Sequence, residues 1–323
     1  MIPRTVALGR HKLHTSSEPP RATIRGRDEE DGKPGERPID YMTESAEAVA
    51  KRIPPLVIEP RHGWRDLGLA ELWEYRELFF FFVWRDLKVR YKQTFFGASW
   101  AILQPVLLMA IFSVSVGRLP GVSPAGVPYP LFVLAGLVPW TLFAQSLAGA
   151  SNSLVAEEAI ITKVYFPRLL LPFAAVASFV LDFGLALAVL GVMMVIYGVT
   201  PGLSMLAIVP LTMLILTTAI GVGTFLAAVN VRYRDVRYVV PFLIQAWLFA
   251  SPVIYTSGLI PEEWRTLFAL NPITGAVEGF RWALLGGDRP SMLILVSAAA
   301  ALVMLVTALL YFRRTERTFA DII

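Results

Sequence analysis

The amino-acid sequence predicts an all-α integral membrane protein with six transmembrane helices, an N-terminal amphipathic interface helix, and an outer re-entrant helical hairpin between spans five and six. Hydrophobic residues make up 55% of the 323 positions and charged residues 17%, with a mean hydropathy of +0.59, whereas soluble domains contain about 25% charged residues. Six apolar segments are near or above the ~20 residues that cross a bilayer as a helix, and none alternates as a barrel strand would. They lie at residues 98–116, 131–150, 169–197, 203–229, 239–255 and 292–312.

The distribution of positive charge predicts the orientation of these spans. With both termini inside, the cytoplasmic side carries 25 of the 29 Lys and Arg residues. The outer side then keeps four, which are Arg118, Arg265, Arg281 and Arg289. Because Lys and Arg accumulate on the cytoplasmic side of membrane proteins, we expect a multi-pass protein of the cytoplasmic (inner) membrane with both termini cytoplasmic.

The chain divides into three predicted regions, which are a disordered cytoplasmic tail at 1–65, the interface helix within 66–97, and the six-helix transmembrane domain at 98–323. Prolines interrupt mixed charge runs in the tail, a composition typical of disorder. Within residues 1–97, 17 Lys and Arg nearly balance 15 Asp and Glu. Because a nucleic-acid-binding arm needs an excess of positive charge, we expect no nucleic acid partner.

Several catalytic chemistries are excluded by the residue types that the sequence lacks. Cysteine is absent, and His11, His14 and His62 all precede the apolar segments. The phosphate-binding pattern G-x-x-x-x-G-K-[ST] is also absent, since Gly32-Lys33-Pro34 has neither the first glycine nor the hydroxyl. An enzyme acting on lipid-linked substrates needs clustered carboxylates or histidines at the interface, and the candidates there, Glu157-Glu158, Asp235 and Glu262-Glu263, have no neighbouring base. We therefore expect no catalytic residue, no metal and no cofactor in this chain, and a membrane body driven by something outside it.

Residues 71–92, just before the first span, are predicted to form the amphipathic helix. From residue 80 onward one helical face is apolar and aromatic, with Phe80, Val83, Trp84, Leu87 and Tyr91. The opposite face carries the cations Arg85, Lys88 and Lys92. Such a helix lies in the membrane interface against lipid headgroups. It is either a generic anchor or a docking surface for a cytosolic partner, with Arg85, Asp86, Lys88 and Arg90.

The cytoplasmic loop between spans two and three, residues 151–168, is predicted to be a partner contact or a gate rather than a plain connector. Glu157 and Glu158 suit the first turn of a short helix, which Pro167 limits. A plain connector would not need the two isoleucines, valine, tyrosine and phenylalanine that follow. In the next cytoplasmic loop, residues 230–238, the arginines satisfy the positive-inside rule, and contact with a cytosolic subunit is the alternative.

On the outer side, residues 257–290 are predicted to form a re-entrant hairpin shielded by protein. Prolines and glycines divide this stretch into two short helices, each too short to span the bilayer and too apolar for a free loop. An interfacial hairpin that only anchors the chain is the alternative. The hairpin residues of interest are Pro261, Trp264, Asn271, Pro272, Glu278, Arg281 and Trp282.

Asp182 is the one acid inside the six predicted spans. It follows Arg168 by about 14 residues, which places it near the middle of the bilayer at ~1.5 Å per residue. An intramembrane carboxylate is a functional candidate, as a proton relay or substrate contact. No Lys, Arg or His in another span can pair with it, so we favour a structural hydrogen bond to Gln104, Gln145 or Gln245.

Five motifs are informative together. They are Arg85-Asp86-Leu87-Lys88-Val89-Arg90-Tyr91-Lys92 leading to Gly97-Ala98-Ser99-Trp100 and Gln104-Pro105, Ile161-Thr162-Lys163-Val164-Tyr165-Phe166-Pro167-Arg168, Tyr233-Arg234-Asp235, Ser251-Pro252-Val253-Ile254-Tyr255, and Asn271-Pro272 followed by Glu278-Gly279-Phe280-Arg281-Trp282. This set resembles the ABC type 2 permeases that export polysaccharides. The resemblance covers the chain from about residue 66 to the end, and the tail lies outside it.

The resemblance implies a permease subunit that pairs with a second copy of itself and with two ATPase subunits, which would bind ATP and Mg. The cargo would be a lipid-linked polysaccharide, with O-antigen of lipopolysaccharide, capsule and teichoic acid as open alternatives. ATPase contacts would be Arg85, Asp86, Lys88, Arg90, Glu157, Glu158, Lys163 and Tyr165. Gate residues would be Ile161, Phe166, Pro167 and Arg168.

The channel would pass between the two copies along spans one and five, with the outer hairpin lining or closing its exit. Aromatic side chains there would offer flat faces to sugar rings, namely Trp100, Phe112, Trp247, Phe249 and Tyr255. Packing or a position at the membrane interface is the alternative for each. Other readings of the whole chain are a drug or lipid exporter of the same fold, a membrane-bound glycan-modifying enzyme, or a voltage- or proton-driven transporter that depends on Asp182.

Overall fold

Helices make up the regular secondary structure of the computed structural model, which describes residues 69–92, 99–117, 126–200, 202–286 and 290–319. No strand occurs within these ranges, so the prediction of an all-α protein is confirmed for them. They all belong to one unit, His62–Ile323. The predicted disordered tail at 1–65 lies outside the described residues.

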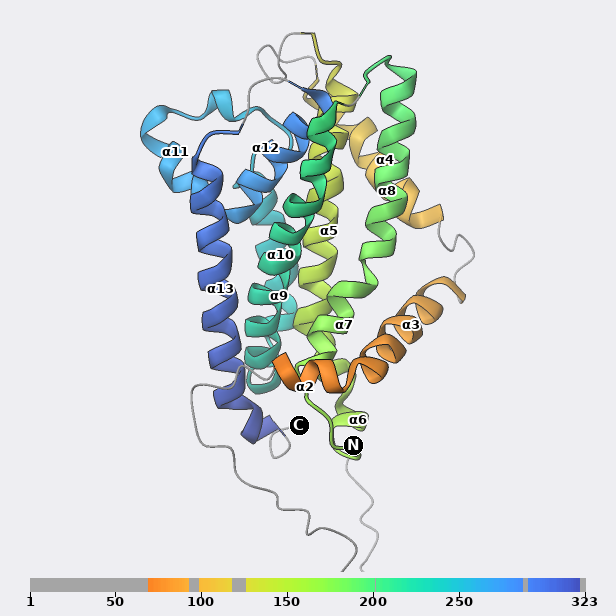
Figure 1. Ribbon diagram of the computed structural model, residues 1–323, viewed down its shortest axis with the longest axis vertical. Coiled ribbons are helices and arrows are strands. Elements are labelled where there is room, and N and C mark those ends of the chain that lie inside the picture. The colour runs from red at the N-terminus through yellow and green to blue at the C-terminus, as the bar shows by residue number, and fades with distance from the viewer. Residues whose placement is uncertain (1–68, 93–98, 118–125, 201, 287–289, 320–323) are drawn as a thin grey trace, which may run out of the picture. The chain divides into compact units, whose positions relative to one another are not determined.

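The elements follow one another in the order α2 (Leu69–Glu74), α3 (Arg76–Lys92), α4 (Ser99–Ser115), α5 (Tyr129–Ala156), α6 (Glu158–Ile161), α7 (Leu170–Ser178), α8 (Val180–Ile196), η1 (Leu203–Ala207), α9 (Ile208–Arg232), α10 (Val236–Phe249), η2 (Ser257–Leu259), α11 (Glu262–Ala269), α12 (Pro272–Leu285), α13 (Leu293–Thr315) and η3 (Glu316–Thr318). Figure 1 shows α2, α3 and α6 at one end of the long helices and α11 and α12 at the other.

Within the described residues, four helical segments are long and apolar enough to cross a membrane, which indicates a multi-pass membrane protein. They are Tyr129–Ala156, Leu170–Ile196, Leu203–Arg232 and Leu293–Thr315, and they match the second, third, fourth and sixth predicted spans. The first and fifth predicted spans correspond to shorter apolar helices, α4 with 17 residues and α10 with 14. The apolar run of the fifth continues to residue 255, but α10 ends at Phe249 because the ring of Pro252 cannot continue the helix.

The long helix α5 lies at the centre of the packing. Of its apolar window 78% is buried, and it contacts α4, α7, α8, α9, α10 and α12. Glycines permit the close approach of its neighbours. A Cβ added to Gly223 of α9 would lie 2.6 Å from the Cβ of Ala150 on α5, and one on Gly221 would lie 2.9 Å from the backbone nitrogen of Leu305 on α13. Larger residues at these positions would force the helices apart.

Two apolar clusters form the interior of the described part. The larger joins α5, α8, α9 and α12, with Phe143 and Phe280 fully buried. The smaller joins the start of the third span and the end of α13 to α3 through Phe82. The interface helix therefore packs against the bundle through this smaller cluster, while Phe80 and Trp84 on another side of it are exposed.

Candidate coupling site and transport path

One side of α3 faces the cytoplasmic loop that the sequence analysis singled out. The ring of Phe82, 2% exposed, lies 5.6 Å from that of Phe166, and both belong to the cluster that contains Ile161. Of the five residues on the predicted lipid-facing side, Phe80 and Trp84 are exposed, as contact with lipid headgroups requires. The other three, Val83, Leu87 and Tyr91, are half-buried, and Val83 packs on the same interior cluster. The structure thus brings the interface helix together with two of the predicted gate residues.

Arg85 joins α3 to the end of α5. Its guanidinium donates two hydrogen bonds to the carboxylate of Glu157, at 2.6 and 3.0 Å, and also binds Asp86 at 2.8 Å. Partial burial lowers the pKa of Arg85, but the hydrogen bonds and charges of Asp86 and Glu157 outweigh it, so the net shift of the pKa is upward from its ordinary value. The bidentate geometry connects the interface helix to the second span in a fixed orientation.

Asp182 binds the last turn of α3. Its carboxylate, 8% exposed as a residue, accepts a hydrogen bond from Arg90 at 2.7 Å and another from the hydroxyl of Tyr91. A glutamine was expected as its partner, but Gln145 instead donates to Gln104 at 3.3 Å. A cationic partner for Asp182 was expected only from another span, whereas Arg90 belongs to the interface helix.

The contact with Arg90 is made where the third predicted span is interrupted, between α7 and α8. Phe179 separates these helices, and its ring lies 3.9 Å beneath the guanidinium of Arg90. Arg90 also donates to the hydroxyl of Ser178 at 3.0 Å and to its carbonyl at 3.4 Å. Because a break in a membrane helix leaves carbonyls in need of donors, Arg90 stabilises this break as well as neutralising Asp182.

The loop after α5 presents a short exposed tip. Thr162, Lys163, Val164 and Tyr165 are exposed, with Tyr165 at 91%, whereas Ile161, Phe166 and Pro167 are buried. Glu158 and Lys88, two further predicted ATPase contacts, are also exposed. The predicted contact residues therefore fall into two groups. Lys163, Tyr165, Lys88 and Glu158 face outward, while Arg85, Asp86, Arg90 and Glu157 are engaged within the chain.

Arg168, the last predicted gate residue, is held by the chain beyond α13. Its backbone N–H donates to the carboxylate of Glu316 at 3.2 Å, and its guanidinium donates to the Glu316 carbonyl. The same carboxylate accepts from Arg313 at 2.9 Å. Sequence analysis missed Glu316, which lies 148 positions from Arg168 and carries no local signal of this role.

At the opposite end, Arg281 of α12 is buried at 8% exposure and satisfies the backbone that follows α10. It donates to the carbonyls of Pro252 at 2.6 Å, Tyr255 at 3.1 Å and Val253, and to that of Phe132 on α5 at 3.3 Å. Its guanidinium carbon lies 3.7 Å over the Phe132 ring. Buried non-helical backbone needs internal donors, and Arg281 donates three hydrogen bonds to this segment and a fourth to α5.

Asn271 ties the outer helices to the same broken segment. Its side-chain oxygen caps α12 through the N–H of Ile273 at 3.1 Å and accepts from the indole of Trp247 at 2.9 Å. Its amide donates to Ser251 at 2.8 Å. Of the remaining predicted hairpin residues, Pro261 and Trp264 are exposed on α11, Pro272 is buried, and Glu278 and Trp282 are half-buried.

The five predicted channel aromatics have different surroundings. Trp100 and Phe249 are exposed by 54% and 57%. The other three are half-buried: Phe112 packs on the larger cluster, Trp247 packs on Phe143 at 5.0 Å between ring centroids, and the Tyr255 hydroxyl donates to the Phe249 carbonyl at 3.0 Å. Tyr238 and Phe242 of α10, which were not among the predicted channel aromatics, are exposed by 69% and 74%. Their spacing of four along α10 was a readable signal that they share its exposed face.

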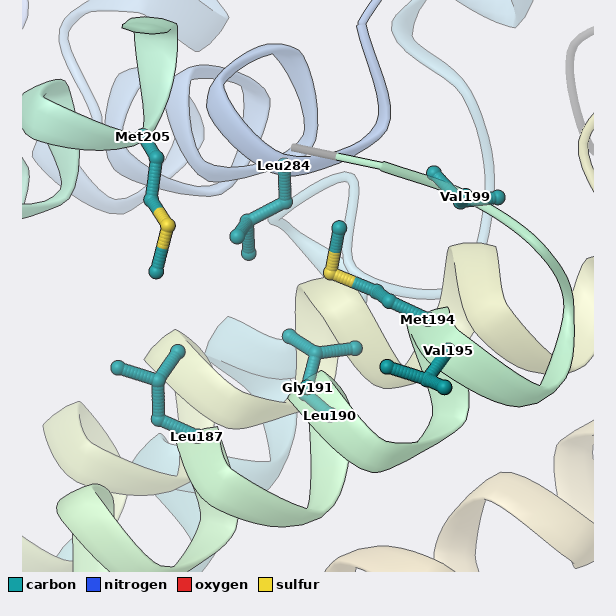
Figure 2. A pocket seen from close by; sticks show the side chains of 8 residues that line it. All are labelled: Leu187, Leu190, Gly191, Met194, Val195, Val199, Met205 and Leu284. Atoms are coloured by element: carbon teal, nitrogen blue, oxygen red, sulfur yellow. The ribbon is translucent and has the colours of Figure 1, made fainter. Parts of the chain in front are cut away.

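One apolar cavity of about 140 Å³ lies between α8, η1 and α12 (Figure 2). Figure 2 shows side chains of α8, among them Leu187 and Met194, facing Met205 and Leu284 across it. Its lining offers no charged or hydroxyl group to a sugar or a nucleotide. Within the described residues, no group of three or more His, Asp or Glu could hold a metal ion.

The comparison with known proteins identifies the family. Residues 77–285 match the family model of the ABC-2 type transporter. The chain belongs to the ABC-2 type transporter family. This match begins in α3 and ends with α12, so the two contacts of α3, the loop tip and the Arg281 site all fall within the matched residues.

Curated relatives of this ABC-2 chain are transport permeases. It is 31% identical over 257 residues to the "O-antigen export system permease protein RfbA" of Myxococcus xanthus, covering 78% of this chain and 98% of the relative. A protein of the same name from Klebsiella pneumoniae is 30% identical, covering 74% and 92%. The "Polysialic acid transport protein KpsM" of Escherichia coli is 24% identical, covering 63% and 79%. The predicted resemblance to polysaccharide-export permeases is therefore confirmed at the level of the family and its named relatives.

Proposed function

We propose that this chain is the transmembrane subunit of an ATP-driven exporter that moves a lipid-linked polysaccharide, of the O-antigen type, across the cytoplasmic membrane. Two copies would enclose the channel, and two separate ATPase subunits would bind ATP and Mg and supply the energy. The names of two of these relatives, both O-antigen export permeases, support the cargo. The family match over residues 77–285 supports the transport role.

The proposal includes six spans with both termini cytoplasmic. Four are the long apolar helices, and α4 and α10 complete the set. The count of 25 Lys and Arg inside against four outside supports this orientation. On this topology α11 and α12 form a re-entrant hairpin. The burial of α12 and the hydrogen bonds from Arg281 to the backbone after α10 support that assignment, because irregular backbone at membrane depth must be enclosed by protein.

The observation that carries the proposal is the double attachment of α3. The middle of α3 is bound to the end of the second span through Arg85 and Glu157, and its last turn is bound to the third span through Arg90 and Asp182. A force applied to α3 or to the neighbouring loop tip would therefore reach both spans through short, charge-assisted contacts. This arrangement suits a membrane subunit whose energy comes from a partner on its cytoplasmic side.

The transport path would run along the exposed faces of α4 and α10, where Trp100, Phe242 and Phe249 are exposed. A polymer that slides needs weak and repeated contacts, since one tight site would stall it. Aromatic rings along a helix provide such contacts through their apolar faces. Glu278, Trp282 and the rest of the outer hairpin would line the exit.

A deletion experiment tests the function. Cells that lack the chain should lose surface polysaccharide and accumulate the lipid-linked polymer on the cytoplasmic side of the membrane, and the full-length chain should restore export. Purification of the tagged chain from native membranes should recover an ATPase with a phosphate-binding loop. Unchanged surface polysaccharide, combined with loss of efflux of a drug or of a lipid, would refute the proposed cargo in favour of another ABC-2 exporter. Export by the purified chain alone, without nucleotide, would refute the dependence on a partner.

A further inference from the structure

Three arginines gather in the turn between α9 and α10, residues 232–237, which we call the arginine turn. Arg232 ends α9, and Arg234 and Arg237 follow within five positions; all three are exposed. Backbone hydrogen bonds order the turn, from the N–H of Tyr233 to Val229 at 2.8 Å and from that of Val236 to Tyr233 at 3.2 Å. The three charges therefore project from a defined backbone, which lowers the entropy cost of ordering this segment when a ligand binds.

The guanidinium groups of the arginine turn make no ion pair with a carboxylate of the described residues. Ion pairs in that part of the chain involve other arginines, namely Arg85, Arg90, Arg265 and Arg313. Two guanidiniums of the turn lie beside tyrosine rings, Arg232 at 5.6 Å from the centroid of Tyr233 and Arg237 at 4.8 Å from that of Tyr238. Arg237 also donates to the Tyr238 hydroxyl at 3.0 Å. With Asp235 as its one acid, the turn keeps an excess of positive charge.

These groups are chemically suited to a phosphate. Arginine presents a planar set of donors that pairs with phosphate oxygens in a bidentate manner, and stacking on an aromatic ring leaves its N–H edge available. The first turn of α10, a helix of 14 residues, adds the partial positive charge of a helix N-terminus. A carboxylate would be attracted by the same charge. On the proposed topology, however, the turn lies at the level of the cytoplasmic lipid headgroups, where the phosphate of a lipid-linked cargo would also lie.

The arginine turn is continuous with an exposed aromatic face. Tyr238, Phe242 and Phe249 are 69%, 74% and 57% exposed and follow one another along α10 at intervals of four and seven residues, which places them on one side of the helix. A lipid-linked glycan carries its phosphate between the lipid and the first sugar. Charge at the foot of α10 and rings above it therefore match the order of groups in such a molecule.

We propose that Arg232, Arg234 and Arg237, together with Tyr238, bind the phosphate group that joins lipid to glycan, at the cytoplasmic start of the transport path. This inference rests on the proposed function, because it needs a lipid-linked cargo and a cytoplasmic position for the turn. The positive-inside rule explains why arginines are found on this side, but it does not require three within six positions, stacked on tyrosines at the foot of an aromatic face.

Binding to the complete transporter tests the site. The chain and its ATPase are reconstituted in nanodiscs of zwitterionic lipid, and affinity is measured for a polyprenyl-diphosphate-linked disaccharide. The variant R232Q/R234Q/R237Q should bind at least about tenfold more weakly, since several charge-assisted hydrogen bonds are removed, and wild-type affinity should fall as salt is added. The variant R232K/R234K/R237K keeps the charge that orients the membrane protein and should bind with intermediate affinity.

Controls separate the outcomes. R314Q removes an exposed arginine in the last turn of α13 and should leave affinity within about twofold. A polyprenyl glycoside without phosphate should bind wild type and the glutamine variant equally. Unchanged affinity of the glutamine variant, or displacement of the probe by an equal fraction of phosphatidylglycerol, would overturn the proposal, the second by assigning the turn to ordinary phospholipid. Failure of wild type to bind the probe, with normal surface polysaccharide in deleted cells, would instead refute the proposed function.

Discussion

The pair formed by Arg90 and Asp182 makes a quantitative prediction. Asp182→Asn keeps the size of the side chain but leaves Arg90 facing a neutral amide, and Arg90→Gln leaves the carboxylate without its cation. Removing one partner of a buried ion pair costs about 3–5 kcal/mol. The side chain of Arg90 is 30% exposed and that of Asp182 10%, so water screens part of the interaction. We therefore expect each single variant to lose about 3 kcal/mol of unfolding free energy, at the lower end of that range.

A double-mutant cycle measures the interaction itself. The variant R90Q/D182N carries no charge at either position and should be more stable than the sum of the two single changes implies, by about 2 kcal/mol, because contacting residues are not additive. Equilibrium unfolding in mixed micelles supplies the four free energies. An interaction energy below about 0.5 kcal/mol, the value of a surface ion pair, would refute the reasoning.

The same variants test the role of the pair in transport. If α3 passes movement to the third span through this contact, both single variants should hydrolyse ATP in complex with the partner but export less polysaccharide per ATP. R90Q/D182N should recover stability without recovering export, since the charge-assisted contact is still missing. R90K/D182E, which keeps both charges, serves as the matched control and should retain part of the export. Wild-type export by D182N would show that movement reaches the spans by another route.

Three further predictions follow from the remaining contacts. Lys163→Glu and Tyr165→Ala, at the exposed tip, should reduce export and co-purification of the ATPase while membrane insertion stays normal; normal export by both would refute a partner contact there. Glu157→Gln should weaken the connection between α3 and α5 by about 1–2 kcal/mol, detected as faster proteolysis of α3, and unchanged proteolysis would argue against that connection. Arg281→Lys should lower the unfolding temperature and Arg281→Ala should lower it further, because lysine has three donors and alanine none for the four carbonyls now satisfied; equal stability of Arg281→Ala and wild type would refute this role.

The helices of the long apolar segments could be predicted because the hydrocarbon interior of a membrane offers the backbone no hydrogen-bond partners. The long apolar runs of α5, α9 and α13 each had to become helices, since a backbone in hydrocarbon must satisfy its own hydrogen bonds. The same rule was less informative for the fifth span, where hydropathy alone continued the helix to residue 255. There the position of Pro252 ends α10 early, and the cost of the broken backbone is offset by Arg281 from a distant helix.

Features of the candidate site that are set by neighbouring residues were easier to predict than contacts between residues far apart in the chain. The short helix limited by Pro167, and the division of the outer stretch into two short helices at Asn271-Pro272, follow from residue types within a few positions. The partners of Arg90 and Arg168 did not follow, because they lie 92 and 148 positions away. Periodicity states which face a residue occupies but not which element packs on that face.

The sequence by itself determined that this chain is rich in apolar segments of membrane-spanning length, and its motifs indicated the family that the comparison then showed, because hydropathy and short motifs are properties of neighbouring residues. Only the tertiary structure decided that cations of the interface helix, expected to face a partner, bind Asp182 and Glu157 within the chain. Only the tertiary structure decided that Arg281 donates hydrogen bonds to the non-helical backbone that follows α10. A buried or half-buried charge takes whichever partner the packing of apolar helices brings within hydrogen-bonding distance, and that packing joins residues far apart in the chain.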